Sequence, residues 1–164
     1  MPRLRSYRPE EFPHFLALDT ETAQDALGEA TDEEKKRLRE KWPRLLAERH
    51  QLTPAGFAAP RAELWVLEGD EGQYLGHVWL TEKDDEISGF KVLEVTTMGI
   101  VREARGQGLG RLLMQKAEGA AREKKIDHIE LSVAGNNRRA RDLYRDLGYD
   151  TTRRTMRKKL REQP

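Results

Sequence analysis

Six consecutive residues, Arg105 to Gly110, read Arg-Gly-Gln-Gly-Leu-Gly and are the most distinctive chemical motif of the chain. An apolar run ending at Val101 precedes them and a helical pattern starts at Leu109, so the segment predicts a strand, a glycine turn and a helix. Glycines let a backbone approach a ligand closely, and the first turn of a helix has unpaired N–H groups and a partial positive charge. The motif therefore predicts an anion site suited to a pyrophosphate. A tight turn without a ligand is the alternative, because a lone glycine cluster is a weak signal.

The spacing of the glycines narrows the class of phosphate ligand. A P-loop needs Lys followed by Ser or Thr after its last glycine, but Arg111 and Leu112 follow Gly110. A dinucleotide fingerprint needs Gly-x-Gly-x-x-Gly, whereas Gly106, Gly108 and Gly110 are evenly spaced. The spacing therefore disfavours both a nucleotide triphosphatase and a Rossmann enzyme.

The glycine motif resembles the acyl-CoA signature Gln/Arg-x-x-Gly-x-Gly/Ala of the GNAT (GCN5-related N-acetyltransferase) superfamily. Downstream, Asn137 to Tyr144 and Leu147 to Tyr149 are similar to that family's Asn-x-x-Ala-x-x-Leu-Tyr and Leu-Gly-Phe/Tyr segments, and Met156 to Leu160 is similar to its closing strand. Arg102 stands where the family usually has proline. The resemblance is dense from about Val92 to Leu160 and only general before it.

The resemblance implies acetyl-CoA as cosubstrate, without a metal. Backbone N–H groups of Gln107 to Arg111 would hold the pyrophosphate, and the pantetheine arm would pair with the preceding strand, where Gly99 permits close approach or forms a β-bulge. Asn137 would bind CoA or a water molecule, or cap a helix. The residues assigned to the cofactor are Met98, Gly99, Ile100, Val101, Arg105, Gly106, Gln107, Gly108, Leu109, Gly110, Arg111 and Asn137.

Tyr144 is the candidate catalytic acid. It matches the position of the family's tyrosine acid, and a phenol with a pKa near 10 can donate a proton to a leaving thiolate. Tyr144 also completes an apolar stripe on its helix, so a core position with the hydroxyl at the rim is the alternative.

The general base has two candidates. Glu94 lies on the central strand, where several family members hold a base, but it is out of register by one residue, and such a slip moves a side chain to the other sheet face. His77 has a pKa range suited to a base at neutral pH, although its apolar neighbours also fit a packing role. A chain of water molecules is the third possibility.

These residues need a framework of alternating strands and helices. Periodicity and turn residues predict strands at 4–7, 64–67, 74–80, 92–101, 129–133 and 156–160, and helices from Phe12, after Thr31, at 109–121 and at 137–147. Pro43 should kink or end the second helix early, and the segment 46–61 is typical of a loop. The prediction is one α/β (α+β) domain over residues 1–164. It has a mixed, mostly antiparallel sheet of six to seven strands flanked by helices on both faces, a GNAT-like fold.

The composition limits the classes of partner that the protein can bind. The chain has 30 Lys+Arg and 29 Asp+Glu, so it has no excess of positive charge that would favour binding of nucleic acid. It has no cysteine, so thiolate chemistry is excluded. No apolar run approaches a membrane span, and we expect a soluble, cytoplasmic protein. The expected function is N-acetylation of a small cationic amine, an aminoglycoside-like compound or a peptide N-terminus. The alternative is a non-catalytic acyl-CoA-binding regulatory module, and a homodimer fits either.

Overall fold

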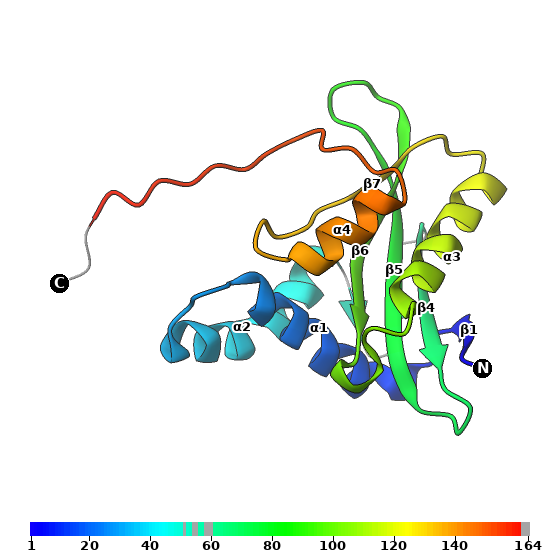
Figure 1. Ribbon diagram of the computed structural model, residues 1–164, viewed down its shortest axis with the longest axis horizontal. Coiled ribbons are helices and arrows are strands. Elements are labelled where there is room, and N and C mark those ends of the chain that lie inside the picture. Colours follow the sequence, from blue (N-terminus) through cyan, green and yellow to red (C-terminus); the bar gives the residue numbers. More distant parts are fainter. Residues whose placement is uncertain (51, 54–55, 58–60, 162–164) are drawn as a thin grey trace.

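A five-stranded sheet forms the centre of the fold (Figure 1). The computed structural model describes residues 1–50, 52–53, 56–57 and 61–161. In sheet order, the strands are β1 (Arg3–Ser6), β4 (Ala62–Glu68), β5 (Tyr74–Asp84), β6 (Lys91–Ile100) and β7 (Ile129–Leu131). Neighbouring strands are antiparallel except β6 and β7, which are parallel. A separate antiparallel pair consists of β2 (Leu52–Thr53) and β3 (Gly56–Phe57).

Helices cover both faces of the sheet. The α-helices of the described residues are α1 (Phe12–Ala26), α2 (Asp32–His50), α3 (Leu109–Glu123) and α4 (Arg138–Asp146), and short 3-10 turns occupy Pro9–Glu11 and Arg102–Ala104. Figure 1 shows α1 and α2 on one side of the sheet and α3 on the other. The helix starts follow their sequence signals: Glu34 N–H donates to the Thr31 hydroxyl at 3.2 Å, and Ala140 N–H donates to the Asn137 side chain at 3.1 Å.

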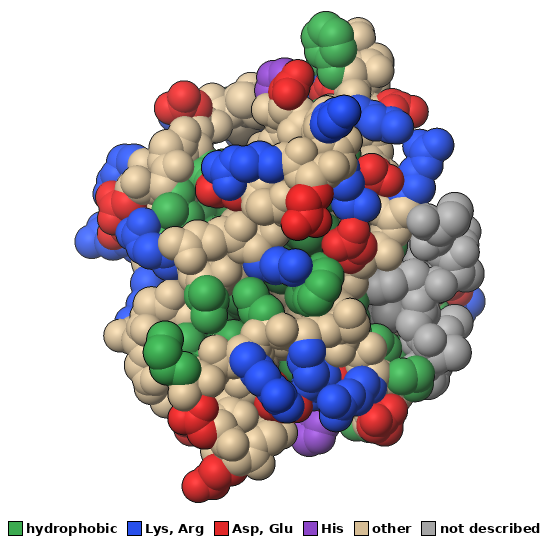
Figure 2. Space-filling view, turned by 90° about the vertical axis from the view of Figure 1, so that its right-hand side faces the viewer, with side chains coloured by type: hydrophobic (Ala, Val, Ile, Leu, Met, Phe, Trp, Pro, Cys, Tyr) green, Lys and Arg blue, Asp and Glu red, His purple; other side chains and the backbone are tan. Residues whose placement is uncertain are grey.

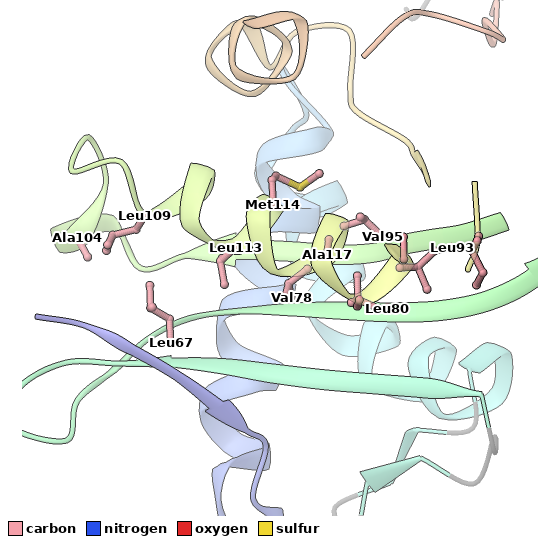
Figure 3. Close-up of a cluster of buried hydrophobic side chains, with 13 residues drawn as sticks. Leu67, Val78, Leu80, Leu93, Val95, Ala104, Leu109, Leu113, Met114 and Ala117 are labelled. Atoms are coloured by element: carbon pink, nitrogen blue, oxygen red, sulfur yellow. The ribbon is translucent and has the colours of Figure 1, made fainter. Parts of the chain in front are cut away.

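The larger core lies between α3 and the sheet. Figure 3 shows Leu113 and Ala117 of α3 facing Val78 and Leu80 of β5. All four side chains are fully buried. Removing apolar surface from water stabilises a fold by roughly 25 cal/mol per Å². This buried layer therefore makes the main hydrophobic contribution to holding α3 on the sheet. The position of the glycine turn, which directly precedes α3, is thereby fixed as well.

A second, smaller core holds α1 and α2 against the opposite face. Its buried members are Phe15, Leu46, Leu64 and Trp79. Phe15 and Trp79 meet edge to face, with ring centroids 6.0 Å apart. This core fixes the two helices against β4 and β5, and α1 also contacts β6.

β6 contains a bulge that opens the sheet. Trp79 pairs with Thr97 and the next residue, Leu80, pairs with Val95, so Thr96 is an extra residue in β6. The parallel pairing with β7 covers only Leu93 to Val95. From Thr96 onward, therefore, the edge of β6 that faced β7 leaves the sheet's hydrogen-bond ladder.

Three sequence expectations about elements are wrong in detail. The main sheet has five strands, where six to seven were expected, because 156–160 forms no strand and lies fully exposed in an extended tail (Figure 1). Helix α2 continues past Pro43 to His50, so proline does not end it early. The segment 46–61 was expected as loop, but parts of it form the last turn of α2 and the β2–β3 pair. Residues 51, 54–55 and 58–60 of the segment lie outside the described residues. Within the described part of the chain, no helix combines the length and apolarity needed to cross a bilayer.

Candidate active site

The glycine turn has the backbone conformation of an anion cradle. Gly106 and Gly108 both have φ in the left-handed region, at 80° and 77°, and Gly108 is the N-cap of α3. A side chain at either position would be strained, so glycine is required by conformation. The first backbone N–H groups of α3 have no partner within the helix, and the helix dipole adds positive charge there. These features fit the pyrophosphate of CoA.

Two arginines lie close to the turn. Arg105 donates from Nε to the Ile100 carbonyl at 2.9 Å, and its guanidinium lies 3.5 Å from Glu21 of α1. Arg105 therefore ties the turn to α1 as well as adding charge. A Cβ on Gly106 would lie 2.9 Å from Nη2 of Arg139, which places this α4 arginine at the turn. The sequence analysis missed Arg139, although its place in the Asn-x-x-Ala segment was a usable signal.

The end of β6 offers a backbone edge with alternating orientation. Val101 N–H donates to the Leu75 carbonyl at 2.9 Å, and the Val101 carbonyl accepts from Ala104, so its backbone groups are used within the protein. Since backbone groups alternate along a strand, Met98 and Ile100 point to the opposite, open edge. There the Ile100 carbonyl accepts from Arg105.

The structure gives a reason for glycine at position 99 that differs from the expected approach of a ligand. A Cβ at this position would lie 3.1 Å from Cγ of Leu18 and 3.2 Å from the Thr22 hydroxyl. The missing side chain therefore faces α1 and lets that helix approach β6 closely. The β-bulge considered for Gly99 lies instead at Thr96.

A cavity of about 490 Å³ lies beside the opened part of β6. Residues of α1 and α2, of the β5–β6 face, of the segment after β7 and of α4 line it. Among the residues that line the cavity are Asp19, Ala23, Trp42, Leu46, Trp79, Thr96, Thr97, Met98, Asn137, Ala140 and Tyr144. The cavity thus joins the open strand edge to the α1–α2 pair.

Tyr144 and Asn137 reach this cavity from α4. Burial raises the pKa of Tyr144 to about 12, so its phenol stays protonated at neutral pH. Tyr144 also packs against the larger core and meets the Tyr149 ring at 6.0 Å, so it holds a core position while lining the cavity. Asn137 caps α4 through its side-chain oxygen while lining the cavity.

The two candidate bases lie in different surroundings. Glu94 forms an ion pair with Lys83, which also lies 3.3 Å from Glu130. Glu94 is not among the described residues that line the cavity. His77 is fully buried behind the cavity wall. Its ring is tilted against that of Phe15 with centroids 4.4 Å apart, and its Nδ1 lies 2.7 Å from the Tyr74 hydroxyl.

Asp19 connects His77 to the cavity. Its Oδ1 lies 3.9 Å from Nε2 of His77 and accepts the Thr97 hydroxyl, while Oδ2 accepts Trp42 Nε1–H at 2.7 Å. None of Asp19, Thr97 and Trp42 was among the site residues predicted from the sequence. A signal was available, because Phe15, Leu18, Asp19 and Thr22 share one helical stripe, on which the two polar residues are conspicuous.

Comparisons with known proteins agree with this geometry. The profile of the acetyltransferase (GNAT) family matches residues 20–149. The uncharacterized N-acetyltransferase YdgE of Bacillus subtilis is 30% identical over 109 residues, which cover 66% of this chain and 68% of YdgE. The mycothiol acetyltransferase of Beutenbergia cavernae is 37% identical over 87 residues, which cover 52% of this chain but only 28% of that protein.

Solved structures share the whole fold. The crystal structure of YycN of Bacillus subtilis superimposes with a TM-score of 0.74 at 25% identity, covering 99% of this chain and 100% of YycN. A Clostridium acetobutylicum protein solved with acetyl-CoA has a TM-score of 0.63 at 17% identity and covers 98% of this chain and 97% of its own, a likeness in fold. With the family profile spanning most of its length, the chain belongs to the acetyltransferase (GNAT) family.

Proposed function

We propose that this acyltransferase moves the acetyl group of acetyl-CoA directly to a primary amine. The observation that carries the proposal is the meeting of three features around α4: the glycine turn, the open edge of β6, and Tyr144. A Cβ on Gly110 would lie 3.1 Å from Leu143, while Ala140 and Tyr144 line the cavity. One helix therefore connects an anion cradle to a protonated phenol.

The chain's residues divide the work of holding the cosubstrate. Bound acetyl-CoA supplies an activated thioester. Backbone N–H groups from Gln107 to Arg111 would bind its pyrophosphate, with charge from Arg105 and Arg139. Met98 and Ile100 would present backbone groups to the pantetheine arm, while Gly99 and Val101 hold that edge against β5. Asn137 would contribute from the opposite wall.

Direct transfer needs two proton movements. The amine nitrogen forms a bond to the acetyl carbon as the thioester C–S bond breaks, the amine gives up a proton, and the thiolate takes one from Tyr144, which recovers it from solvent. His77 and Glu94 remain the proposed proton acceptors. His77 has the closer connection to the cavity, through Asp19 at 3.9 Å, whereas Lys83 holds Glu94 elsewhere.

The test is calorimetric titration with acetyl-CoA, CoA and NADH. We expect micromolar binding of the two CoA compounds and none of NADH. Gly108→Trp should abolish this binding because its side chain fills the cradle, and Gly119→Trp on the same helix, about three turns away, is the matched control. Unchanged binding by a folded Gly108→Trp protein would refute the pyrophosphate site. Binding without acetylation of any amine would instead favour a non-catalytic acyl-CoA-binding module.

A further inference from the structure

One half of the cavity has apolar walls and a single charge. On the side of α1 and α2, the walls include Ala23, Trp42, Leu46 and Trp79. Among the described residues that line the whole cavity, Asp19 alone carries a formal charge at neutral pH. This half lies across from Tyr144 and Asn137, which we assign to the cosubstrate, and so belongs to the acceptor.

Asp19 is a buried, ionised carboxylate. Only 3% of its surface is exposed. Burial opposes ionisation, but the neighbouring His77 ring and the hydrogen bonds from Thr97 and Trp42 together hold the pKa of Asp19 below its usual range. The negative charge is therefore present at neutral pH.

The charge has no permanent counter-cation in the described structure. No lysine or arginine of the described residues lies within ion-pair distance of Asp19, and its two hydrogen-bond donors are a hydroxyl and an indole. His77, 3.9 Å away, carries charge only when protonated. A carboxylate has about four acceptor positions, so the hydrogen bonds from Trp42 and Thr97 leave capacity for another donor. A buried charge whose hydrogen-bond donors are neutral still gains from a cation, which makes this position a candidate binding site.

We propose that Asp19 binds the acceptor amine as an ammonium, which passes one proton to the Asp19–His77 pair before the neutral nitrogen attacks the thioester, and that the acceptor is a monoamine on an apolar body. This inference rests on the proposed acetyl transfer and narrows its substrate class. One carboxylate can pair with one ammonium, and a second ammonium of a polyamine or aminoglycoside would meet the apolar walls around Trp79 and Leu46. Trp42 and Trp79 offer aromatic surfaces against which the apolar part of such an amine can pack next to its cationic group.

The first experiment compares amines as acceptors for the wild-type protein. Release of CoA is measured with hexylamine and 2-phenylethylamine against spermidine and kanamycin. The proposal expects kcat/KM at least about tenfold higher for the two monoamines, because desolvating a second charge without a partner costs at least that factor. A preference for spermidine or kanamycin, or no acetylation of either monoamine by protein that binds acetyl-CoA, overturns the inference and leaves the proposed function standing. Failure to bind acetyl-CoA overturns both.

The second experiment separates charge recognition from a structural role. Asp19→Asn is nearly isosteric and should lower kcat/KM for 2-phenylethylamine by about 100-fold, within the range for unpairing a buried charge. Inhibition by neutral 2-phenylethanol and the affinity for acetyl-CoA should stay within about threefold, a factor small beside that loss. Glu29→Gln removes the same charge from an exposed position and serves as control. Equal losses for the amine and the alcohol would mean that Asp19 merely fixes Trp42 and Thr97, and would overturn the proposal.

A further pair of variants keeps the test decisive if Asp19→Asn does not fold. Trp42→Phe and Thr97→Val each remove one neutral hydrogen bond from Asp19 but keep its charge. If Asp19 binds the ammonium, both variants retain the preference for 2-phenylethylamine over 2-phenylethanol. Loss of that preference in both variants contradicts the proposal.

Discussion

At the scale of single residues, Tyr144 combines burial with access to the cavity. Burial raises its pKa to about 12, so the phenol stays protonated as pH rises and loses its proton only near that value. An acid of this kind is available over the whole working range of an enzyme. No alkaline loss of activity below about pH 11 should therefore come from its ionisation.

Replacing Tyr144 by Phe tests its role as acid. The variant keeps the ring, so packing against the larger core remains, but it has no proton to give. We expect kcat to fall by about 100-fold or more, in the range typical of general acid catalysis, with the acetyl-CoA dissociation constant nearly unchanged. Steady-state kinetics and calorimetry on the same preparation measure both. Equal loss of turnover and affinity, or of neither, speaks against the acid role.

The sequence singled out the residues proposed for the cofactor but not those proposed for the acceptor. Gly106 and Gly108 are recognisable because their type and spacing carry the backbone requirement. Asp19, Thr97 and Trp42 come together only in three dimensions, from α1, the β6 bulge and α2. A bulge depends on pairing with a neighbouring strand, so no local pattern places Thr96 and Thr97.

At the scale of elements, the glycine at the N-cap of α3 and Gly119 inside that helix have opposite structural demands. Gly108 has φ of 77° at the N-cap, whereas Gly119 lies inside the helix with open space where a Cβ would be. Gly108→Ala should destabilise the protein by about 1–2 kcal/mol through left-handed strain. Gly119→Ala should stabilise it by about 0.5–1 kcal/mol.

Thermal unfolding followed by circular dichroism measures both alanine variants. For a chain of this size, 1 kcal/mol corresponds to roughly 2–4 °C in Tm, so the two shifts have measurable and opposite signs. Shifts in the same direction would contradict the assigned start of α3.

Elements with a strong local pattern were predictable, and those that depend on a partner were not. The stripe through Leu109, Leu113 and Ala117 predicts α3 because helix periodicity is local. Alternation between Met156 and Leu160 also fits a strand, but a strand needs a neighbouring edge, and the structure pairs this segment with none among the described residues. Pro43 removes one helical donor, and the rest of α2 still supports the helix.

At the scale of the whole molecule, paired carboxylates determine the response to acid. Burial opposes ionisation of Glu11 and Glu63, but hydrogen bonds and charge from Arg5 and Lys124, respectively, hold both pKa values below their usual range, and Asp19 is shifted the same way. Groups with depressed folded pKa values stabilise the fold above their unfolded pKa, near 4, and lose that contribution as pH falls.

We therefore expect acid to weaken the fold. The free energy of unfolding should be nearly constant from about pH 7 to 5.5 and should decrease steadily below about pH 4.5, where the unfolded chain binds more protons. Urea unfolding over a pH series gives the curve. Increasing stability between pH 5 and 3 would contradict the ion pairs described.

The extended tail gives a second test at this scale. Residues 151–161 are exposed. Within this tail, the Arg153 guanidinium lies 3.4 Å from the carboxylate of Asp85 in the β5–β6 turn. Removal of residues 154–164 should lower Tm by less than about 2 °C, because exposed surface contributes little to stability. A larger loss in differential scanning calorimetry would mean that this segment forms a paired strand in solution.

Charge on the surface is distributed without a dominant sign. Figure 2 shows basic and acidic side chains interspersed on one face, as expected for a formal net charge of +1. Association with the substrate should therefore depend little on ionic strength at long range. This expectation agrees with recognition through one buried carboxylate.

The placement of the tryptophans gives the protein an internal optical reporter. Two of the three, Trp42 and Trp79, line the cavity, while Trp65 lies on the sheet with Lys116 Nζ 3.6 Å above its ring. A molecule that enters the cavity changes the polarity around the first two indoles and leaves the third as a constant background. Emission intensity and wavelength thus follow occupancy directly, without a label.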